Sequence, residues 1–424
     1  MLNRTIAPQF KEVDRISLIS PGHVKLDNGC NIFYFNSGDQ EMVRLEWIFG
    51  NLRFNAENPL LNLAVNSMLT EGTSSLNASE IADHIDFYGA FLQADYGFDQ
   101  SQVTLYSLNK HLSKTLPVIK DILTDSVFPQ KELTTYIRNQ QQKLQVNLQK
   151  NDFVARRVFN KAMHGENNYG LSPEIPEYQK LKQADLLQHF KQMYQPANCS
   201  IFVAGKVDQD ILDLIQDMFG DWQNTGVAAD TGQPVLHSAK EHFYYVEKPD
   251  ALQSAIRMGL RTINRSQPDF PALQVLNTVL GGYFGSRLMA NIREDKGYTY
   301  GIGSAMTSLK HCGSLFIASE VGADVCRDAV KEIEKEVNRL KTELIPEDEL
   351  SLVRNYMLGS LLGSLENVFS HADKFKNVYF SGLDYAYYEQ YTETIKTVTA
   401  EQLLQLANKY LDFDKFYKVI VGKY

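Results

Sequence analysis

The chain has 424 residues, of which 44% are hydrophobic and 22% charged, as in ordinary soluble globular proteins with more than one domain. Acidic residues outnumber basic ones by 51 to 42, a net charge of -9 that argues against a nucleic-acid partner. No apolar run approaches the ~20 residues that a membrane helix needs. Residues 1–8 show no signal-peptide core, so we expect a cytoplasmic protein without a membrane partner.

The first half of the chain is expected to begin with strands and then to become mainly helical. Asp27-Asn28-Gly29 between two apolar runs predicts a tight hairpin. Asn77 with Glu80 three residues later predicts a capped helix that ends near Gly89. We expect strands at residues 24–26, 32–35, 43–48, 90–96, 102–108 and 200–205, and helices at 59–69, 77–89, 110–125 and 130–148.

The second half is expected to repeat this order. Strands are predicted at residues 242–247, 254–262, 299–307 and 313–319, a helix at 286–295, and further helices through most of 323–411. Three short segments recur at an offset of 216 or 217 residues, and the closing strands, which end near Gly205 and Gly422, are one of them. A repeated register of this kind indicates two homologous halves.

These patterns predict the fold class α+β, with two homologous halves that each form a mainly antiparallel sheet with helices packed on one face. We expect an N-terminal domain at residues 1–222, a linker at 223–240 that is rich in small residues, and a C-terminal domain at 241–424. Four cysteines lie far apart and form no C-x-x-C pair, so reduced and buried thiols are expected.

Residues 281–300, G-G-Y-F-G-S-R-L-M-A-N-I-R-E-D-K-G-Y-T-Y, form the most informative segment of the chain. Its glycines allow a close approach of the backbone or a tight turn. Arg293 and Tyr300 are seven residues apart across a helix end, where both side chains could bind a carbonyl or carboxylate. The alternative is a capped helix with Arg293 in solvent and Tyr300 in the sheet.

This segment resembles the S-R-L-F…R-E-x-x-G-x-x-Y block of the pitrilysin family of zinc metallopeptidases, the inverzincins, which include insulin-degrading enzyme and the mitochondrial processing peptidase. The resemblance extends over nearly the whole chain in element order. It implies that Arg293 and Tyr300 are the Arg/Tyr pair that helps to hold substrate near the metal. It also aligns the family's peptide-binding edge strand with residues 92–96.

The family's zinc motif, H-F-L-E-H-M-L-F-x-G-T, is altered in this chain. Residues 63–73 read L-A-V-N-S-M-L-T-E-G-T, so the resemblance places the two zinc histidines at Leu63 and Ser67 and the general-base glutamate at Asn66. The third ligand, a glutamate on a later helix, falls near Gln145. Leucine offers no ligand and an amide is no general base, so we expect no zinc and no catalytic residue in this chain.

The resemblance therefore implies a non-catalytic, substrate-binding subunit of a heterodimeric peptidase that acts on peptides. A homologous zinc-binding subunit would be the partner, and zinc would be the cofactor of that partner. The alternative is a structural or assembly protein of the same fold, like the core subunits of respiratory complexes. A third possibility, a peptidase that functions alone with unusual ligands, is disfavoured because no replacement His/Glu cluster is visible in the sequence.

Overall fold

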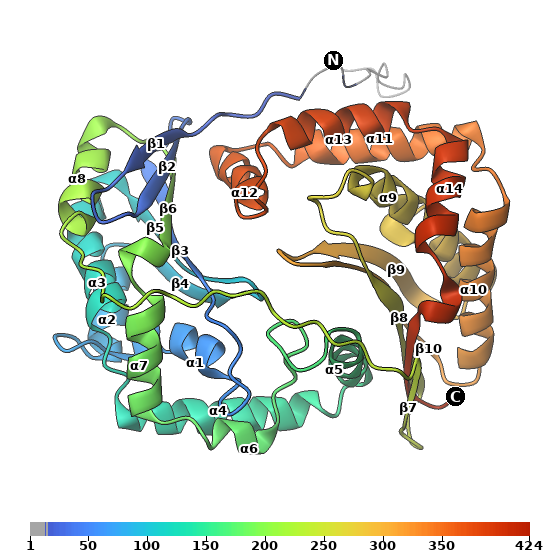
Figure 1. The fold of residues 1–424 in the computed structure, drawn as a ribbon, viewed down its shortest axis with the longest axis horizontal. Coiled ribbons are helices and arrows are strands. Elements are labelled where there is room, and N and C mark those ends of the chain that lie inside the picture. Colours follow the sequence, from blue (N-terminus) through green and yellow to red (C-terminus); the bar gives the residue numbers. More distant parts are fainter. Residues whose placement is uncertain (1–12, 14–15) are drawn as a thin grey trace, which may run out of the picture.

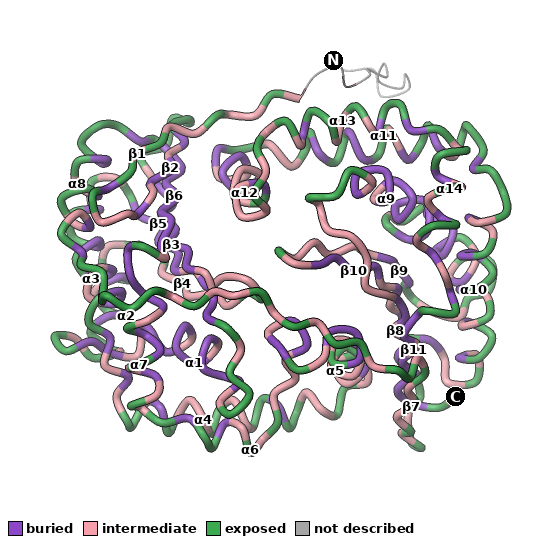
Figure 2. The backbone as a smooth tube through the Cα atoms, viewed as in Figure 1, coloured by how far each residue is buried: buried purple, intermediate pink, exposed green. Residues whose placement is uncertain are grey.

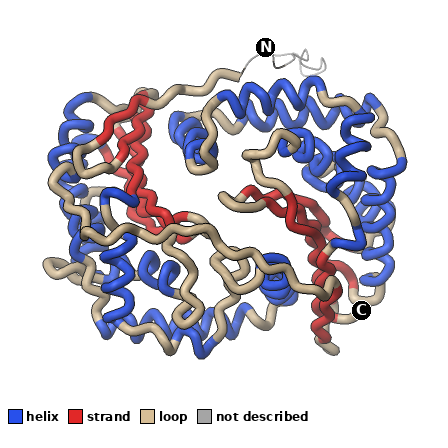
Figure 3. The backbone as a smooth tube through the Cα atoms, in the orientation of Figure 1, coloured by secondary structure: helices blue, strands red, loops and turns tan. Residues whose placement is uncertain are grey.

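The computed structural model describes residue 13 and residues 16–424, and it contains two β-sheets on opposite sides of the molecule (Figure 1). Helices cover the outer side of each sheet, and the inner sides face one another (Figure 3). The segment 1–8, in which no signal-peptide pattern is found, lies outside the described residues. The predicted α+β class with two sheet-and-helix halves is confirmed.

The first sheet has six strands in the order β1-β2-β6-β3-β5-β4. Only β2 and β6 run parallel, and the other neighbours are antiparallel. The predicted hairpin is confirmed, since β1 and β2 pair around a turn in which Gly29 has a φ of 95°. The strands are β1 (Gly22–Lys25), β2 (Asn31–Asn36), β3 (Met42–Gly50), β4 (Phe91–Tyr96), β5 (Gln100–Leu108) and β6 (Cys199–Gly205).

The second sheet has five strands in the order β7-β11-β8-β10-β9. Apart from β1, each sheet consists of five strands, which can be counted along the chain within their half. In both sheets these strands lie side by side in the order first, fifth, second, fourth and third. In both sheets the first and fifth strands are the parallel pair. This identity of topology confirms the predicted repeat. The strands are β7 (Phe243–Glu247), β8 (Gln253–Thr262), β9 (Thr299–Ser308), β10 (Gly313–Gly322) and β11 (Tyr417–Gly422).

The helices also follow one another in the same order in the two halves. In the first half they are α1 (Leu61–Ser67), α2 (Ala78–Phe87), α3 (Leu112–Asp125), α4 (Gln130–Asn147), α5 (Asn151–His164), α6 (Ile175–Tyr178), α7 (Gln183–Met193) and α8 (Gln209–Phe219). In the second half they are α9 (Phe270–Asn277), α10 (Cys326–Thr342), α11 (Glu347–Gly363), α12 (Val368–Tyr379), α13 (Ala386–Thr397) and α14 (Ala400–Tyr410). Five helices lie between the fourth and fifth strands of each half, so α5 and α12 occupy equivalent places.

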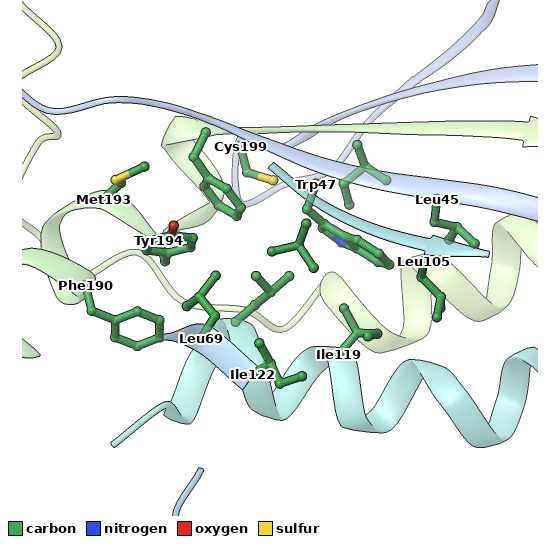
Figure 4. Packing of buried hydrophobic residues seen from close by; sticks show 14 of the residues in the cluster. Leu45, Trp47, Leu69, Leu105, Ile119, Ile122, Phe190, Met193, Tyr194 and Cys199 are labelled. Atoms are coloured by element: carbon green, nitrogen blue, oxygen red, sulfur yellow. The ribbon is translucent and has the colours of Figure 1, made fainter. Parts of the chain in front are cut away.

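The core of the first half lies between its sheet and the outer helices. Figure 4 shows Leu45 and Trp47 of β3 packed towards Ile119 and Ile122 of α3. Full burial of a side chain of this size contributes about 2–3 kcal/mol relative to exposure. The predicted capping box of α2 is also present, since the Asn77 side chain accepts a hydrogen bond from the Glu80 amide.

Two equivalent helices are exchanged between the halves. α5 of the first half packs on β8 and β11 of the second sheet, and α12 of the second half packs on β2 and β6 of the first (Figure 1). Each exchanged helix forms its own apolar cluster, with Phe159 of α5 in one and Ala372 of α12 in the other. Each sheet is therefore covered on its inner face too, and β3 is buried on both sides (Figure 2).

Polar side chains join α12 to the inner face of the first sheet. Arg44 and Glu46 of β3, with side chains 6% and 4% exposed, lie 3.0 Å apart. Arg44 also binds Asp373 at 2.7 Å, and Lys376 binds both Glu46, at 2.5 Å, and Asp373, at 2.8 Å. Two cations and two anions thus neutralise one another, as buried charges require.

The tips of two hairpins form another contact between the halves. Asp99, between β4 and β5, accepts a hydrogen bond from the Tyr169 hydroxyl and a second from the Lys310 amide, at 2.8 Å, in the turn between β9 and β10. Because Asp99 belongs to one half and Lys310 to the other, this carboxylate bridges the two sheets. All four cysteines are free and buried. None of the helices in the described part of the chain is both long and apolar enough to cross a membrane.

Candidate functional site

The segment aligned with the family's zinc motif forms α1 and the short 3-10 turn Leu69–Glu71. Leu63 and Ser67 are four residues apart on this helix, so they share one face, and both are half-buried. Leu63 packs against the hydrophobic core of the first half. Since its side chain carries no donor atom, the first ligand position of the motif serves packing.

Asn66, at the position of the general base, is fully buried. Its Oδ1 accepts a hydrogen bond of 2.8 Å from the Tyr194 hydroxyl, and its Nδ2 has no partner among the described residues. Tyr194 is buried as well, and burial raises the pKa of its phenol far above the usual value, so it remains a neutral donor. Asn66 is therefore a structural hydrogen-bond acceptor in the core.

The remaining two positions do not complete a metal site. Ser67 lies beside Tyr136 of α4, a phenol whose pKa burial raises, while Gln145, on the same helix, is exposed. Residue 13 and residues 16–424 contain no group of three or more His, Cys, Asp or Glu side chains that could hold a metal ion. A zinc ion does not fit Leu63, Asn66, Ser67 and Gln145, because none of them supplies an imidazole or a carboxylate.

Arg293 and Tyr300 are brought together by the segment between the helix at Met289–Asp295, which is wound as a π-helix, and the start of β9. The Arg293 Nε donates a hydrogen bond of 3.0 Å to the carbonyl oxygen of Tyr300. The Arg293 guanidinium carbon lies 4.7 Å from the centre of the Phe284 ring. The Tyr300 side chain is 93% exposed, and that of Phe284 is 65% exposed.

This arrangement combines the two alternatives that the sequence left open. Tyr300 does lie in the sheet, where it is the second residue of β9, but its hydroxyl points into solvent. Arg293 is only 35% exposed and uses Nε within the chain, so its two terminal nitrogens remain as donors. Its carboxylate contact, Glu294, is distant at 3.8 Å. The pair can therefore donate hydrogen bonds to a ligand oxygen.

Contacts that the sequence analysis did not identify hold this block in place. Arg287, two residues before the π-helix, forms a bidentate ion pair with Glu349 of α11, with both distances 2.8 Å. Gly281 is required for close packing, because a Cβ there would lie 2.5 Å from the Ser304 amide nitrogen of β9. No local pattern in the sequence links Arg287 to Glu349, because the two residues are 62 positions apart.

Both sheets present a free edge strand. β4, which contains the aligned residues 92–96, is the last strand of the first sheet, and β9 is the last strand of the second. In β4, the Gln93 amide donates a hydrogen bond of 2.6 Å to Asp95. An edge strand has backbone groups with which an extended peptide can pair.

The chain thus has two repeated α+β halves, and none of the four positions aligned with the zinc motif carries a zinc ligand. Known proteins with zinc-peptidase names are similar to it. The inactive-domain model of peptidase family M16 matches residues 180–357. The chain is 28% identical over 306 residues to the uncharacterized zinc protease YmxG of Bacillus subtilis, which covers 71% of this chain and 73% of that protein.

Solved structures show the same fold. A peptidase M16 inactive domain from Pseudomonas fluorescens is similar with a TM-score of 0.86 at 22% identity, over 95% of this chain and 98% of that one. A chain of complex III2 from Candida albicans, solved with Inz-5 bound, is similar with a TM-score of 0.77 at 14% identity over 95% of each chain. Together these findings confirm the resemblance to the pitrilysin-type peptidases of family M16.

Proposed function

We propose that this chain is the non-catalytic, substrate-binding subunit of a heterodimeric zinc peptidase that acts on peptides. A homologous chain with an intact H-x-x-E-H motif would supply the zinc and the general base. The observation that carries the proposal is the contrast between the two motifs. Asn66 is fully buried and hydrogen-bonded in the core, whereas Tyr300 is 93% exposed beside an arginine with free donors.

The chemistry of the Arg/Tyr block supports a role at a partner's catalytic centre. A carbonyl oxygen gains negative charge when its carbon is attacked, and donors placed beforehand around that oxygen stabilise the transition state. Arg293 carries a permanent charge, and its Nε contact with the Tyr300 carbonyl fixes the direction of its terminal nitrogens. The Tyr300 hydroxyl adds a second donor. Tyr300 is exposed and Arg293 is partly exposed, so a partner subunit can approach both groups.

The position of Tyr300 on an edge strand supports a peptide as the substrate. β9 pairs with β10 on one side only, so its other side can add an extended segment by backbone hydrogen bonding. A peptide bound there would pass directly beside Tyr300. We assign no substrate role to the first-half edge strand β4.

We place the pair of subunits in the cytoplasm. All four cysteines of this chain are free and buried. Thiols that form no disulfide are typical of proteins in a reducing compartment.

A structural or assembly role is the second candidate, and the fold shared with a chain of complex III2 favours it. The exchange of α5 and α12 would suit a rigid scaffold. A scaffold, however, has no use for an exposed Tyr300 beside Arg293, and the substrate-binding role accounts for both residues.

The experiment is reconstitution with a homologous chain from the same host that bears H-x-x-E-H. The two chains are purified separately, mixed at increasing ratios, and assayed with a fluorogenic peptide library. We expect peptide cleavage to rise until the ratio reaches one to one. Stable association without any gain in cleavage would favour the scaffold instead.

A further inference from the structure

A pocket of about 510 Å³ opens at one end of the second sheet, away from the Arg293–Tyr300 pair. Its walls come from the end of β8, the turn between β9 and β10, the segment between α14 and β11, and Leu236 of the connection between the halves. A volume of this size suits a small organic molecule. Nothing in the proposed peptidase role uses this pocket.

Arg261, near the end of β8, lines the pocket without a counter-ion. Its side chain makes no hydrogen bond or ion pair within the described part of the chain, and its Nη1 is buried without a partner. Successive side chains of a strand point to opposite faces, so Arg261 faces away from Leu260 and Thr262. Buried polar groups in native proteins are nearly always hydrogen-bonded, so this guanidinium nitrogen calls for an acceptor from outside the chain.

The positive charge of Arg261 also acts on neighbouring groups. The pKa of the His164 imidazole is lowered to about 4, first by burial and then by Arg261. Burial raises the pKa of the Cys312 thiol to about 11, and Arg261 opposes this shift. The Asp99 carboxylate, which also raises the pKa of the Cys312 thiol, already accepts hydrogen bonds from the Tyr169 hydroxyl and the Lys310 amide. The field of Arg261 is thus not neutralised by a bound carboxylate.

The rim of the pocket adds two lysines. Lys409 binds Asp269 at 2.7 Å, and Lys415 binds Asp412 at 3.1 Å. These exposed pairs leave the rim close to neutral, so the net positive charge of the pocket belongs to Arg261. The rest of the lining combines apolar residues, Leu236, Leu260, Ile263 and Tyr410, with the polar residues Asn264, Gln267 and His311.

We propose that this pocket binds a small organic anion, with its phosphate or carboxylate group on Arg261 and its apolar body against Leu236. Arginine is the residue best suited to such oxyanions, because its planar fork donates two parallel hydrogen bonds. The site is separate from the Arg293–Tyr300 pair and independent of the heterodimer proposal.

The test is calorimetric titration of the full-length chain with phenyl phosphate, phenylacetate and inorganic phosphate at one ionic strength. We expect a single site that prefers an organic anion to inorganic phosphate, and the tighter of the two organic probes identifies the charged group. Arg261→Gln should weaken binding at least about tenfold. Arg156→Gln removes the same charge from an exposed position on α5 outside the pocket, and should leave binding unchanged.

Equal binding by the wild type and Arg261→Gln, or no binding of any probe, would overturn the proposal. If Arg261→Gln does not fold, Arg261→Lys takes its place, since it retains the charge and removes the planar fork of donors. In that case a loss of affinity supports the site and unchanged affinity contradicts it. Binding of inorganic phosphate as tightly as phenyl phosphate would overturn the organic part of the assignment.

Discussion

The Arg293 Nε lies 3.0 Å from the carbonyl oxygen of Tyr300, and this contact ties the end of a helix to the first residues of an edge strand. It uses one donor of the guanidinium and leaves the terminal nitrogens for a ligand. The phenol of Tyr300 extends from the same place into solvent. The contact brings two residues that are seven positions apart to one place on the surface.

Loss of either side chain should impair the reconstituted pair. We expect Arg293→Ala to lower kcat about 100-fold and Tyr300→Phe about tenfold, because each removes a donor that acts mainly in the transition state. Steady-state kinetics measure the effect, and size-exclusion chromatography checks that the two chains still associate. Arg156→Ala is the matched control for lost charge. Unchanged kinetics in both variants would remove the substrate role.

Restoring histidines at Leu63 and Ser67 should not produce an active zinc enzyme. The double variant still lacks a carboxylate near Gln145 and a base at position 66, so only two of the required groups are present. We expect no cleavage by this chain alone, measured with the same peptides and accompanied by determination of bound zinc. Full activity of the double variant would mean that the alignment of the motif is wrong.

Asn66→Glu should destabilise the fold by about 3 kcal/mol. The longer, ionisable side chain would enter a fully buried position where only the Tyr194 hydroxyl faces it, and burial of a carboxyl without a cation is costly. Urea denaturation gives the free energy of unfolding. Gln145→Glu, at an exposed position of α4, is the matched control and should change this free energy little.

The exchanged helices should make the halves interdependent. Residues 16–222 alone would expose the apolar side of α5 and the inner face of the first sheet, and residues 241–424 would expose α12 and the second sheet. We expect neither fragment to show cooperative unfolding by circular dichroism, whereas the two fragments mixed together should regain it. Two independent transitions in the intact chain would contradict this expectation.

The ion network on α12 predicts a pH-dependent stability. Burial would raise the pKa of Asp373, but Arg44 and Lys376 outweigh it and hold the pKa below its usual value of 3.8. A carboxylate with a lowered pKa stabilises the fold at neutral pH, and this contribution is lost as the pH falls through the folded-state pKa. Asp373→Asn should therefore be less stable than the wild type at neutral pH, and the difference should shrink below about pH 4. Urea titrations at several pH values test this, and a difference that does not vary with pH would refute it.

Local signals allowed much of the fold to be predicted. The Asn28-Gly29 turn and the Asn77–Glu80 capping box depend on residues a few positions apart, and both are found as expected. The repeat was visible because each half retained its closing strand and glycine. Such features need no knowledge of distant contacts.

The exchange of α5 and α12 could not be predicted, because the sequence shows which helix face is apolar but not which sheet covers it. The burial of β3 on both sides also depends on distant residues. A strand was expected at 43–48, but its Arg44 and Glu46 are paired with Asp373 and Lys376 of α12, 329 and 330 positions away. At the candidate site, the spacing of Arg293 and Tyr300 suggested proximity, but the link through a backbone carbonyl became visible only in three dimensions.

The most direct test of the central claim is a titration of a homologous H-x-x-E-H chain with this chain, with peptide cleavage and zinc content measured at each ratio. We predict that zinc resides in the homologous chain alone and that cleavage saturates at one to one. Stoichiometric zinc with cleavage activity in this chain alone would contradict the account.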